Sequence, residues 1–171
     1  MAKILVVDDN PDVLNLIADI LESHDYEVKT VSNGASAIKE LESNDYDMVL
    51  TDLMMPDVSG FDILSRVRAH PKFRYLPVII LTASTDTENK LIALDLGATD
   101  FLAKPLDQSE LGLRVRNTLA AKAYQDQLAY YDALTKLPNR HLFLEDLSWA
   151  LKMAKRQNEK LSLLSIEIDN F

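Results

Sequence analysis

Residues 46–57, YDMVLTDLMMPD, decide the fold, because a short apolar run ends there in a carboxylate. The run at 48–50 lies between Asp47 and Asp52. Its length and composition predict a strand that is buried on both faces, which is typical of parallel sheets. An acid at the end of a buried strand is costly to desolvate unless other elements bring complementary groups to it. We therefore expect other strands to end beside Asp52.

The sequence up to residue 121 alternates short apolar runs with segments in which apolar residues recur every three or four positions. The first pattern predicts strands and the second predicts helices. Five such alternations predict an α/β domain with a five-stranded parallel sheet and helices on both faces. The predicted strands are 3–7, 27–31, the run that ends at Asp52, 78–81 and 100–103.

Charge is distributed unevenly: residues 1–121 contain 11 Lys+Arg against 20 Asp+Glu, whereas residues 122–171 contain 7 of each. We expect no nucleic-acid partner, because phosphate binding requires a basic face. No apolar run is long enough to cross a bilayer, so we expect no membrane partner either. The absence of cysteine excludes disulfides and thiolate chemistry and favours a cytoplasmic location.

Polar side chains stand at the ends of four predicted strands: Asp8 and Asp9, Asp52, Thr82, and Lys104. Ligands of open α/β sheets bind at the carboxyl ends of the strands. Three carboxylates in one pocket repel one another, and oxygen ligands without His or Cys favour Mg²⁺ as the compensating cation. Lys104 and Thr82 suit phosphoryl oxygens. Because no Gly-rich phosphate loop is present, a carboxylate that accepts a phosphoryl group is favoured over nucleotide hydrolysis.

Each of these residues also has a structural explanation when it is taken singly. Asp52 could be a loop or capping acid, and the pair Asp8–Asp9 could cap a helix that begins after Asn10. Thr82 could be a strand-end hydroxyl with a local hydrogen bond, and Lys104 could be solvated. Their occurrence together at four strand ends favours the functional interpretation.

Four motifs resemble the receiver domain of two-component response regulators: ILVVDDN (4–10), VLTDLMMPDVSG (49–60), IILTA (79–83) and DFLAKP (100–105). The resemblance covers residues 1 to about 121. It implies a flavodoxin-like (CheY-like) fold with sheet order 2-1-3-4-5. It also implies that Asp52 is the phosphoacceptor for a sensor histidine kinase.

The same resemblance implies roles for the neighbouring residues. Mg²⁺ would be held by Asp8, Asp9, Asp52 and the backbone carbonyl of Met54. Lys104 would pair with the phosphoryl group, Thr82 would donate a hydrogen bond to it, and the Lys104–Pro105 peptide bond would be cis. Phe101 would be either an aromatic switch that turns inward with Thr82 or simply a core residue.

Residues 131–143, YDALTKLPNRHLF, and 163–171, LLSIEIDNF, resemble the first helix and first strand of GGDEF-type diguanylate cyclase domains. We therefore divide the chain into a receiver domain (1–121), a helical linker (122–131) and a GGDEF-like fragment (132–171). Glu167 stands where the family has a metal-binding Asp. Asp132, Asn139 and Arg140 are either caps and turn residues or the family's structured lead into the cyclase domain. The GG(D/E)EF signature is absent from this chain, so we expect no cyclase activity from it alone.

These observations lead to two functional hypotheses. In the first, phosphorylation of Asp52 controls a cyclase-type, cyclic di-GMP-producing output by forming a homodimer. This dimer would form through the fourth helix, the fifth strand, the fifth helix and the helical stalk that continues into the linker (122–131). The apolar positions 111, 115 and 119 would then be either domain core or a dimer seam. In the second, the receiver is a phosphorylation-dependent protein-interaction module with a non-catalytic GGDEF-like tail.

Overall fold

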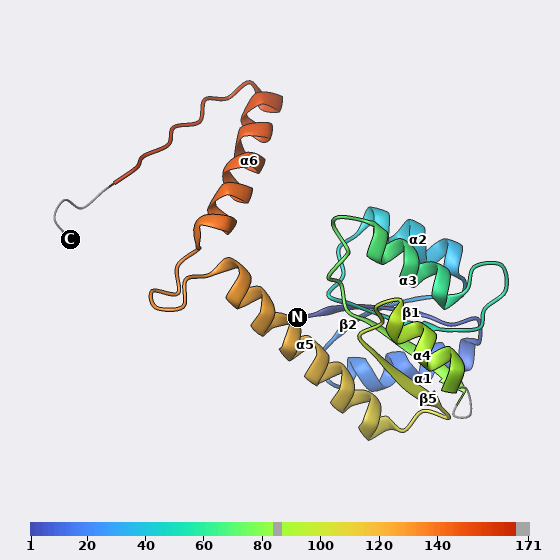
Figure 1. Cartoon of the computed structure of the whole chain (residues 1–171). Coiled ribbons are helices and arrows are strands. Elements are labelled where there is room, and N and C mark those ends of the chain that lie inside the picture. Colours follow the sequence, from blue (N-terminus) through green and yellow to red (C-terminus); the bar gives the residue numbers. More distant parts are fainter. Residues whose placement is uncertain (84–86, 167–171) are drawn as a thin grey trace. The chain divides into compact units, whose positions relative to one another are not determined.

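The chain divides into two units, Met1–Lys122 and Ala123–Phe171, and the computed structural model describes residues 1–83 and 87–166. Strands and helices alternate in the first unit, as the sequence predicts (Figure 1). The strands are β1 (Lys3–Val7), β2 (Glu27–Val31), β3 (Met48–Asp52), β4 (Val78–Ala83) and β5 (Asp100–Lys104). The helices are α1 (Pro11–Glu22), α2 (Gly34–Ser43), α3 (Gly60–Ala69), α4 (Thr87–Asp95) and α5 (Gln108–Tyr130).

The strands form one parallel sheet in the order β2-β1-β3-β4-β5, which confirms the flavodoxin-like fold. Every residue of the central strand β3 is buried, as its apolar composition predicts. β4 and β5 extend further than predicted, to Ala83 and Lys104. The reason is mutual pairing, because Thr82 is in register with Ala103 and Ala83 with Lys104. Polar side chains at these positions thus stand on the sheet itself.

Each face of the sheet is covered by its own set of helices. On one face, Leu41 of α2, Ile63 of α3 and Ala93 of α4 belong to one apolar cluster with the sheet. Figure 1 shows α2 and α3 together on this face. On the other face, Ile17 of α1 packs in a second cluster to which α5 contributes Leu111. The two layers hold the sheet between them and leave its carboxyl edge for the site.

The apolar stripe on α5 belongs to the domain core. Leu111 and Val115 are completely buried, and Leu119 packs partly buried against the same cluster. The alternative that these residues form a dimer seam is therefore wrong for Leu111 and Val115.

Local hydrogen bonds explain where α1 and α3 begin. Asn10 caps α1 as predicted, with its side chain accepting from the amide of Asp12 at 2.9 Å, and Pro11 occupies the first turn. At α3, Ser59 and Asp62 form a capping box in which each side chain accepts from the other residue's backbone amide. Both helices start directly after loops that follow β1 and β3, so the caps also shape the edge of the sheet.

The second unit contains the end of α5 and the helix α6 (Arg140–Gln157), followed by irregular backbone up to residue 166. The predicted strand over 163–171 is wrong for its described part, because residues 163–166 form no strand and are exposed. A strand needs a hydrogen-bonding neighbour, and the described residues of this unit offer none to it. Glu167 lies outside the described residues. Within the described chain, no helix is long and apolar enough to span a membrane.

Candidate functional site

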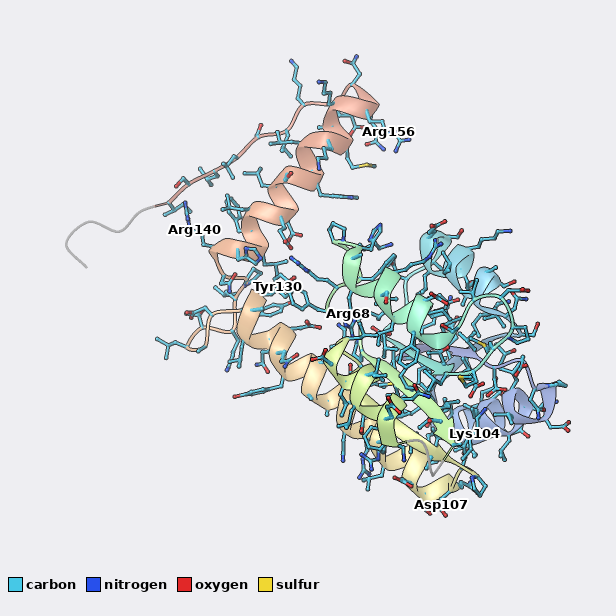
Figure 2. The ribbon with its side chains drawn as sticks, turned by 45° about the vertical axis from the view of Figure 1, so that its right-hand side comes forward. Arg68, Lys104, Asp107, Tyr130, Arg140 and Arg156 are labelled. Atoms are coloured by element: carbon cyan, nitrogen blue, oxygen red, sulfur yellow. The ribbon has the colours of Figure 1, made fainter. Side chains whose placement is uncertain are left out.

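The carboxyl ends of β1, β3, β4 and β5 bring polar side chains to one edge of the sheet. Because β1 and β3 are neighbours, the residues that follow Val7 lie beside the end of β3 at Asp52. β4 separates β3 from β5, and it brings Thr82 to the same edge. Figure 2 shows Lys104 at the end of β5, where the loop toward Asp107 and α5 begins.

Three carboxylates meet at this edge. Asp8, Asp9 and Asp52 each offer one oxygen such that all three oxygens lie within 4.8 Å of one another. Asp8 is completely buried, Asp52 is 7% exposed, and Asp9 is exposed. Asp8 is also fixed by the amide of Asn10, which donates to Asp8 Oδ1 at 2.9 Å. The cluster therefore has two fixed carboxylates and one that faces solvent.

Lys104 joins the two buried carboxylates. Its Nζ lies 2.7 Å from Asp8 Oδ2 and 2.7 Å from Asp52 Oδ1, which makes both contacts charge-assisted hydrogen bonds. The peptide bond that follows, Lys104–Pro105, is cis, in agreement with what the receiver resemblance implies. The predicted constellation of Asp8, Asp52 and Lys104 is thus a set of direct contacts.

Burial and charge pairing shift the pKa values of Asp52 and Lys104. Burial raises the pKa of the Asp52 carboxyl, and the negative charges of Asp8 and Asp9 act in the same direction, while Lys104 opposes them. Burial lowers the pKa of Lys104, but hydrogen bonds and charges from Asp52 and Asp8 outweigh it, so the Lys104 pKa is raised overall. One ammonium therefore compensates three carboxylates incompletely, and the site favours a further positive charge.

A glycine that the sequence analysis did not single out holds the loop beside Asp52. The amide of Gly60 donates to the carbonyl of Leu53 at 3.0 Å. A Cβ atom added to Gly60 would lie 2.4 Å from the carbonyl oxygen of Asp52, which is backbone and cannot turn away. The signal in the sequence was Gly60 itself, at the start of a helix where Ala would be the better helix former.

The remaining predicted residues are Thr82, Phe101 and Met54, and none of them forms a hydrogen bond to Asp52 that is identified among the described residues. Thr82 is 2% exposed, and its hydroxyl has a weak contact of 3.4 Å to the carbonyl oxygen of Ala83. Phe101 is half-buried against the apolar cluster that contains α3 and α4. The side chain of Met54 is 70% exposed, so this residue can offer its backbone to the site without obstructing it.

This arrangement is suited to an anionic reacting group and a hard cation. Asp52 is a nearly buried carboxylate in contact with the Lys104 ammonium, and an ammonium can bind oxygens of a phosphoryl group. The three clustered donors are all carboxylate oxygens, the ligand type that Mg²⁺ prefers. The residues present therefore fit a magnesium ion.

Comparisons with known proteins agree with this site. A family model of the response regulator receiver domain matches residues 4–116, and a model of the diguanylate cyclase GGDEF domain matches residues 129–171. The chain is 38% identical to the response regulator ArlR of Staphylococcus saprophyticus over 119 residues, which are 70% of this chain and 53% of ArlR. It is 33% identical to the transcriptional regulatory protein GltR of Pseudomonas aeruginosa over 149 residues, 84% of this chain and 62% of GltR. The chain thus spans less than two thirds of either relative.

Solved structures of receiver domains have the same fold. A putative response regulator from Chloroflexus aurantiacus has a TM-score of 0.68 and 35% identity, and the match covers 70% of this chain and 98% of that one. The receiver domain of the sensor histidine kinase PA1611 from Pseudomonas aeruginosa, solved with magnesium in its active-site cleft, has a TM-score of 0.65 and 32% identity. That match covers 70% of this chain and 98% of the PA1611 domain. The chain therefore belongs to the response regulators of two-component systems, with a receiver domain followed by a fragment of a GGDEF domain.

Proposed function

We propose that Asp52 accepts a phosphoryl group from a sensor histidine kinase and that Lys104 and Thr82 bind the transferred phosphoryl oxygens. Receiver domains accept phosphoryl groups from sensor histidine kinases. The observation that carries the proposal is the position of Lys104 Nζ, 2.7 Å from both Asp8 and Asp52. An Asp52 oxygen forms a bond to phosphorus while the bond between phosphorus and the donor's imidazole nitrogen breaks, and that nitrogen keeps the electron pair.

Asp8, Asp9, Asp52 and the backbone carbonyl of Met54 are proposed as the protein ligands of Mg²⁺. Receiver domains bind Mg²⁺ at an acidic site of this kind. The ion, when bound, supplies positive charge to the transferred phosphoryl group. The protein's own contribution is to hold Asp8 and Asp52 in place through Lys104 and to leave Asp9 free to turn toward the ion.

The proposed output is a homodimer formed through α4, β5 and α5 and extended by the helical linker 122–131, which brings two cyclase-type domains together. Thr82 and the switch residue Phe101 carry the change from Asp52 to this face. The support is the exposure of apolar side chains there, with Leu91 of α4 65% exposed and Leu113 of α5 49% exposed. Clustered, exposed apolar side chains mark interaction surfaces, and the proposal takes these two leucines to belong to one such surface.

The same exposed leucines favour a second candidate, in which the phosphorylated face binds a separate protein and the GGDEF-like fragment (132–171) does not catalyse. The two candidates differ in one measurable property. Light scattering should show a doubling of mass after phosphorylation if the face binds a second copy, and an unchanged mass if it binds another protein.

Phosphorylation of Asp52 is tested by intact-mass spectrometry after incubation with acetyl phosphate and Mg²⁺. We expect the wild type to gain one phosphoryl group and Asp52→Asn to gain none. Asp57→Asn is the matched control, since Asp57 is an exposed acid in the same loop with a left-handed backbone that Asn adopts readily. A phosphoryl gain by Asp52→Asn, or no gain by the wild type, contradicts the assignment.

A further inference from the structure

The junction between α5 and α6 leaves backbone groups of two helices to be satisfied within a few residues. The last carbonyls of α5 and the first amides of α6 have no partner inside their own helices. Tyr130 ends α5 and Arg140 begins α6, and both are labelled in Figure 2. Whether this junction is flexible or rigid depends on which groups form hydrogen bonds with these carbonyls and amides.

Asn139 satisfies both helix ends at once. Its backbone amide donates to the carbonyl of Tyr130 at 2.8 Å, and its side-chain Nδ2 donates to the carbonyl of Ala129 at 2.8 Å. Its Oδ1 accepts from the first amides of α6, at 2.9 Å from His141 and 3.1 Å from Leu142. One side chain therefore contacts the end of α5 with its donor and the start of α6 with its acceptor.

The nine residues between the helices (131–139) form hydrogen bonds with one another. Tyr131 and Pro138 form an antiparallel bridge, and the amide of Asp132 donates to the carbonyl of Leu137 at 2.8 Å. The Asp132 carboxylate accepts from both the amide and the hydroxyl of Thr135, at 2.8 and 2.7 Å. These bonds hold the two ends of the loop together. The orientation of α6 then depends on the contacts at its N-terminus.

An aromatic pair adds a second contact across the junction. The ring of Tyr130 stacks on that of His141, with centroids 5.6 Å apart and planes inclined by 14°. His141 lies two residues after Asn139, and Tyr130 is the last residue of α5. Both contacts oppose rotation of one helix about the end of the other.

We propose that Asn139 is a positioning residue that fixes the orientation of α6 relative to the end of α5. Its consequence for signalling rests on the proposed function: a change that reaches the end of α5 is carried into the GGDEF-like segment as a rigid movement. The junction then keeps a constant angle between α5 and α6 and does not act as a flexible linker.

The chemistry of the amide side chain suggests a selective variant. Asn139→Asp keeps an oxygen that caps α6, because Asp and Asn are equally good N-caps. It replaces the Nδ2 donor by a carboxylate oxygen that faces the carbonyl of Ala129 and repels it. The variant should therefore keep helix α6 and lose the attachment of α6 to α5. The matched control is Asn158→Asp, the same change at the C-terminal end of α6, which is an 18-residue helix.

The absence of cysteine allows a direct measurement on the full chain. Spin labels on Gln125→Cys and Lys155→Cys, both exposed positions, report the distance between the end of α5 and α6. We expect a single narrow distance distribution in the otherwise unchanged protein and in Asn158→Asp. Asn139→Asp should widen the distribution by roughly twofold or more and remove the hydrogen-exchange protection of the Asn139 amide. Its helix content by circular dichroism should stay the same, which a purely structural role in helix α6 would not allow.

A broad distribution in the unchanged protein, or a narrow one in Asn139→Asp with helix content retained, overturns the proposal. If Asn139→Asp loses helix content, Tyr130→Ala provides the second test, since it removes the aromatic contact and leaves both caps in place. An unchanged width of the distance distribution in Tyr130→Ala supports Asn139 as the positioning residue. A distribution at least about twice as wide as that of the unchanged protein overturns the role of Asn139. None of these measurements requires phosphorylation, so failure of Asp52 to accept a phosphoryl group would leave the result on Asn139 intact.

Discussion

Replacing Asp52 by Asn should stabilise the magnesium-free protein at neutral pH. The oxygens of Asp8, Asp9 and Asp52 lie within 4.8 Å of one another. At an effective dielectric constant of about 20, two like unit charges at this separation repel by about 3 kcal/mol, and Asp52 has two such neighbours. Lys104, at 2.7 Å from Asp52, attracts it by about 6 kcal/mol under the same rule. The repulsion and the attraction nearly cancel. The cost of burying the Asp52 carboxylate therefore decides whether Asp52→Asn raises or lowers the free energy of unfolding.

We therefore expect Asp52→Asn to raise the free energy of unfolding by about 1 kcal/mol in EDTA, because Asn needs no charge desolvated and still accepts from Lys104. The pH dependence follows from the raised pKa of Asp52. A carboxyl with a raised folded-state pKa contributes stability that is present below its usual pKa of 3.8 and is lost as the pH rises through the folded value. The difference in the free energy of unfolding between Asp52→Asn and the wild type should thus be largest at neutral pH and should disappear as the pH falls toward 3.8.

The assay is urea unfolding followed by circular dichroism, with EDTA or with Mg²⁺, at several pH values. Added Mg²⁺ should stabilise the wild type more than Asp52→Asn, since the variant lacks one charged ligand. Asp57→Asn serves as the control, with no expected change in either condition. An Asp52→Asn variant that is less stable than the wild type in EDTA at neutral pH would refute the reasoning, because the Lys104 pair would then outweigh burial and repulsion.

Three further substitutions test the environment of the site and the packing of the domain. Gly60→Ala should destabilise the receiver by about 1–3 kcal/mol in urea, since its Cβ would overlap the carbonyl of Asp52; a midpoint equal to that of wild type would contradict this. Lys104→Met should leave two buried carboxylates without a cation, so we expect its free energy of unfolding in EDTA to be lower by about 1–3 kcal/mol. Mg²⁺ should restore part of this loss, and an equal loss with EDTA and with Mg²⁺ would argue against a shared ion site. Tyr46→Phe should cost about 1 kcal/mol, because the Tyr46 hydroxyl donates to Glu40 at 2.6 Å. Burial and Glu40 raise the Tyr46 pKa, so the wild type alone should lose this stability as the pH rises above 10; equal alkaline profiles would exclude this cause.

Most of the fold was predictable because its determinants are local. The apolar run before Asp52 predicted a strand that is indeed buried throughout, and the cap at Asn10 predicted the start of α1. The prediction was less accurate where partners decide the outcome. β4 and β5 are longer than predicted because each supplies the other's hydrogen bonds, whereas residues 163–166 form no strand because they have no described neighbour to pair with.

The composition of the site was also predictable, since polar residues at the ends of successive strands must meet at one edge of a parallel sheet. The contribution of each residue was not. Asp8 and Asp9 are adjacent acids, yet Asp8 is buried against Lys104 and Asp9 faces solvent, because successive side chains leave the backbone in different directions. The cost of a methyl group at Gly60 likewise depends on a carbonyl eight positions earlier in the chain.

The sequence by itself determined the alternation of strands and helices, the family, and the acidic residues and the lysine that meet at the carboxyl edge of the sheet. Only the tertiary structure decided that Leu111 and Val115 are core and not a dimer seam, that Lys104 bridges two carboxylates, and that Asn139 joins two helices. The physical reason is that periodicity and capping act over a few residues and are visible in the sequence. The partner of a buried or hydrogen-bonded group is set by the order in which the strands pair and by the path of the chain between them.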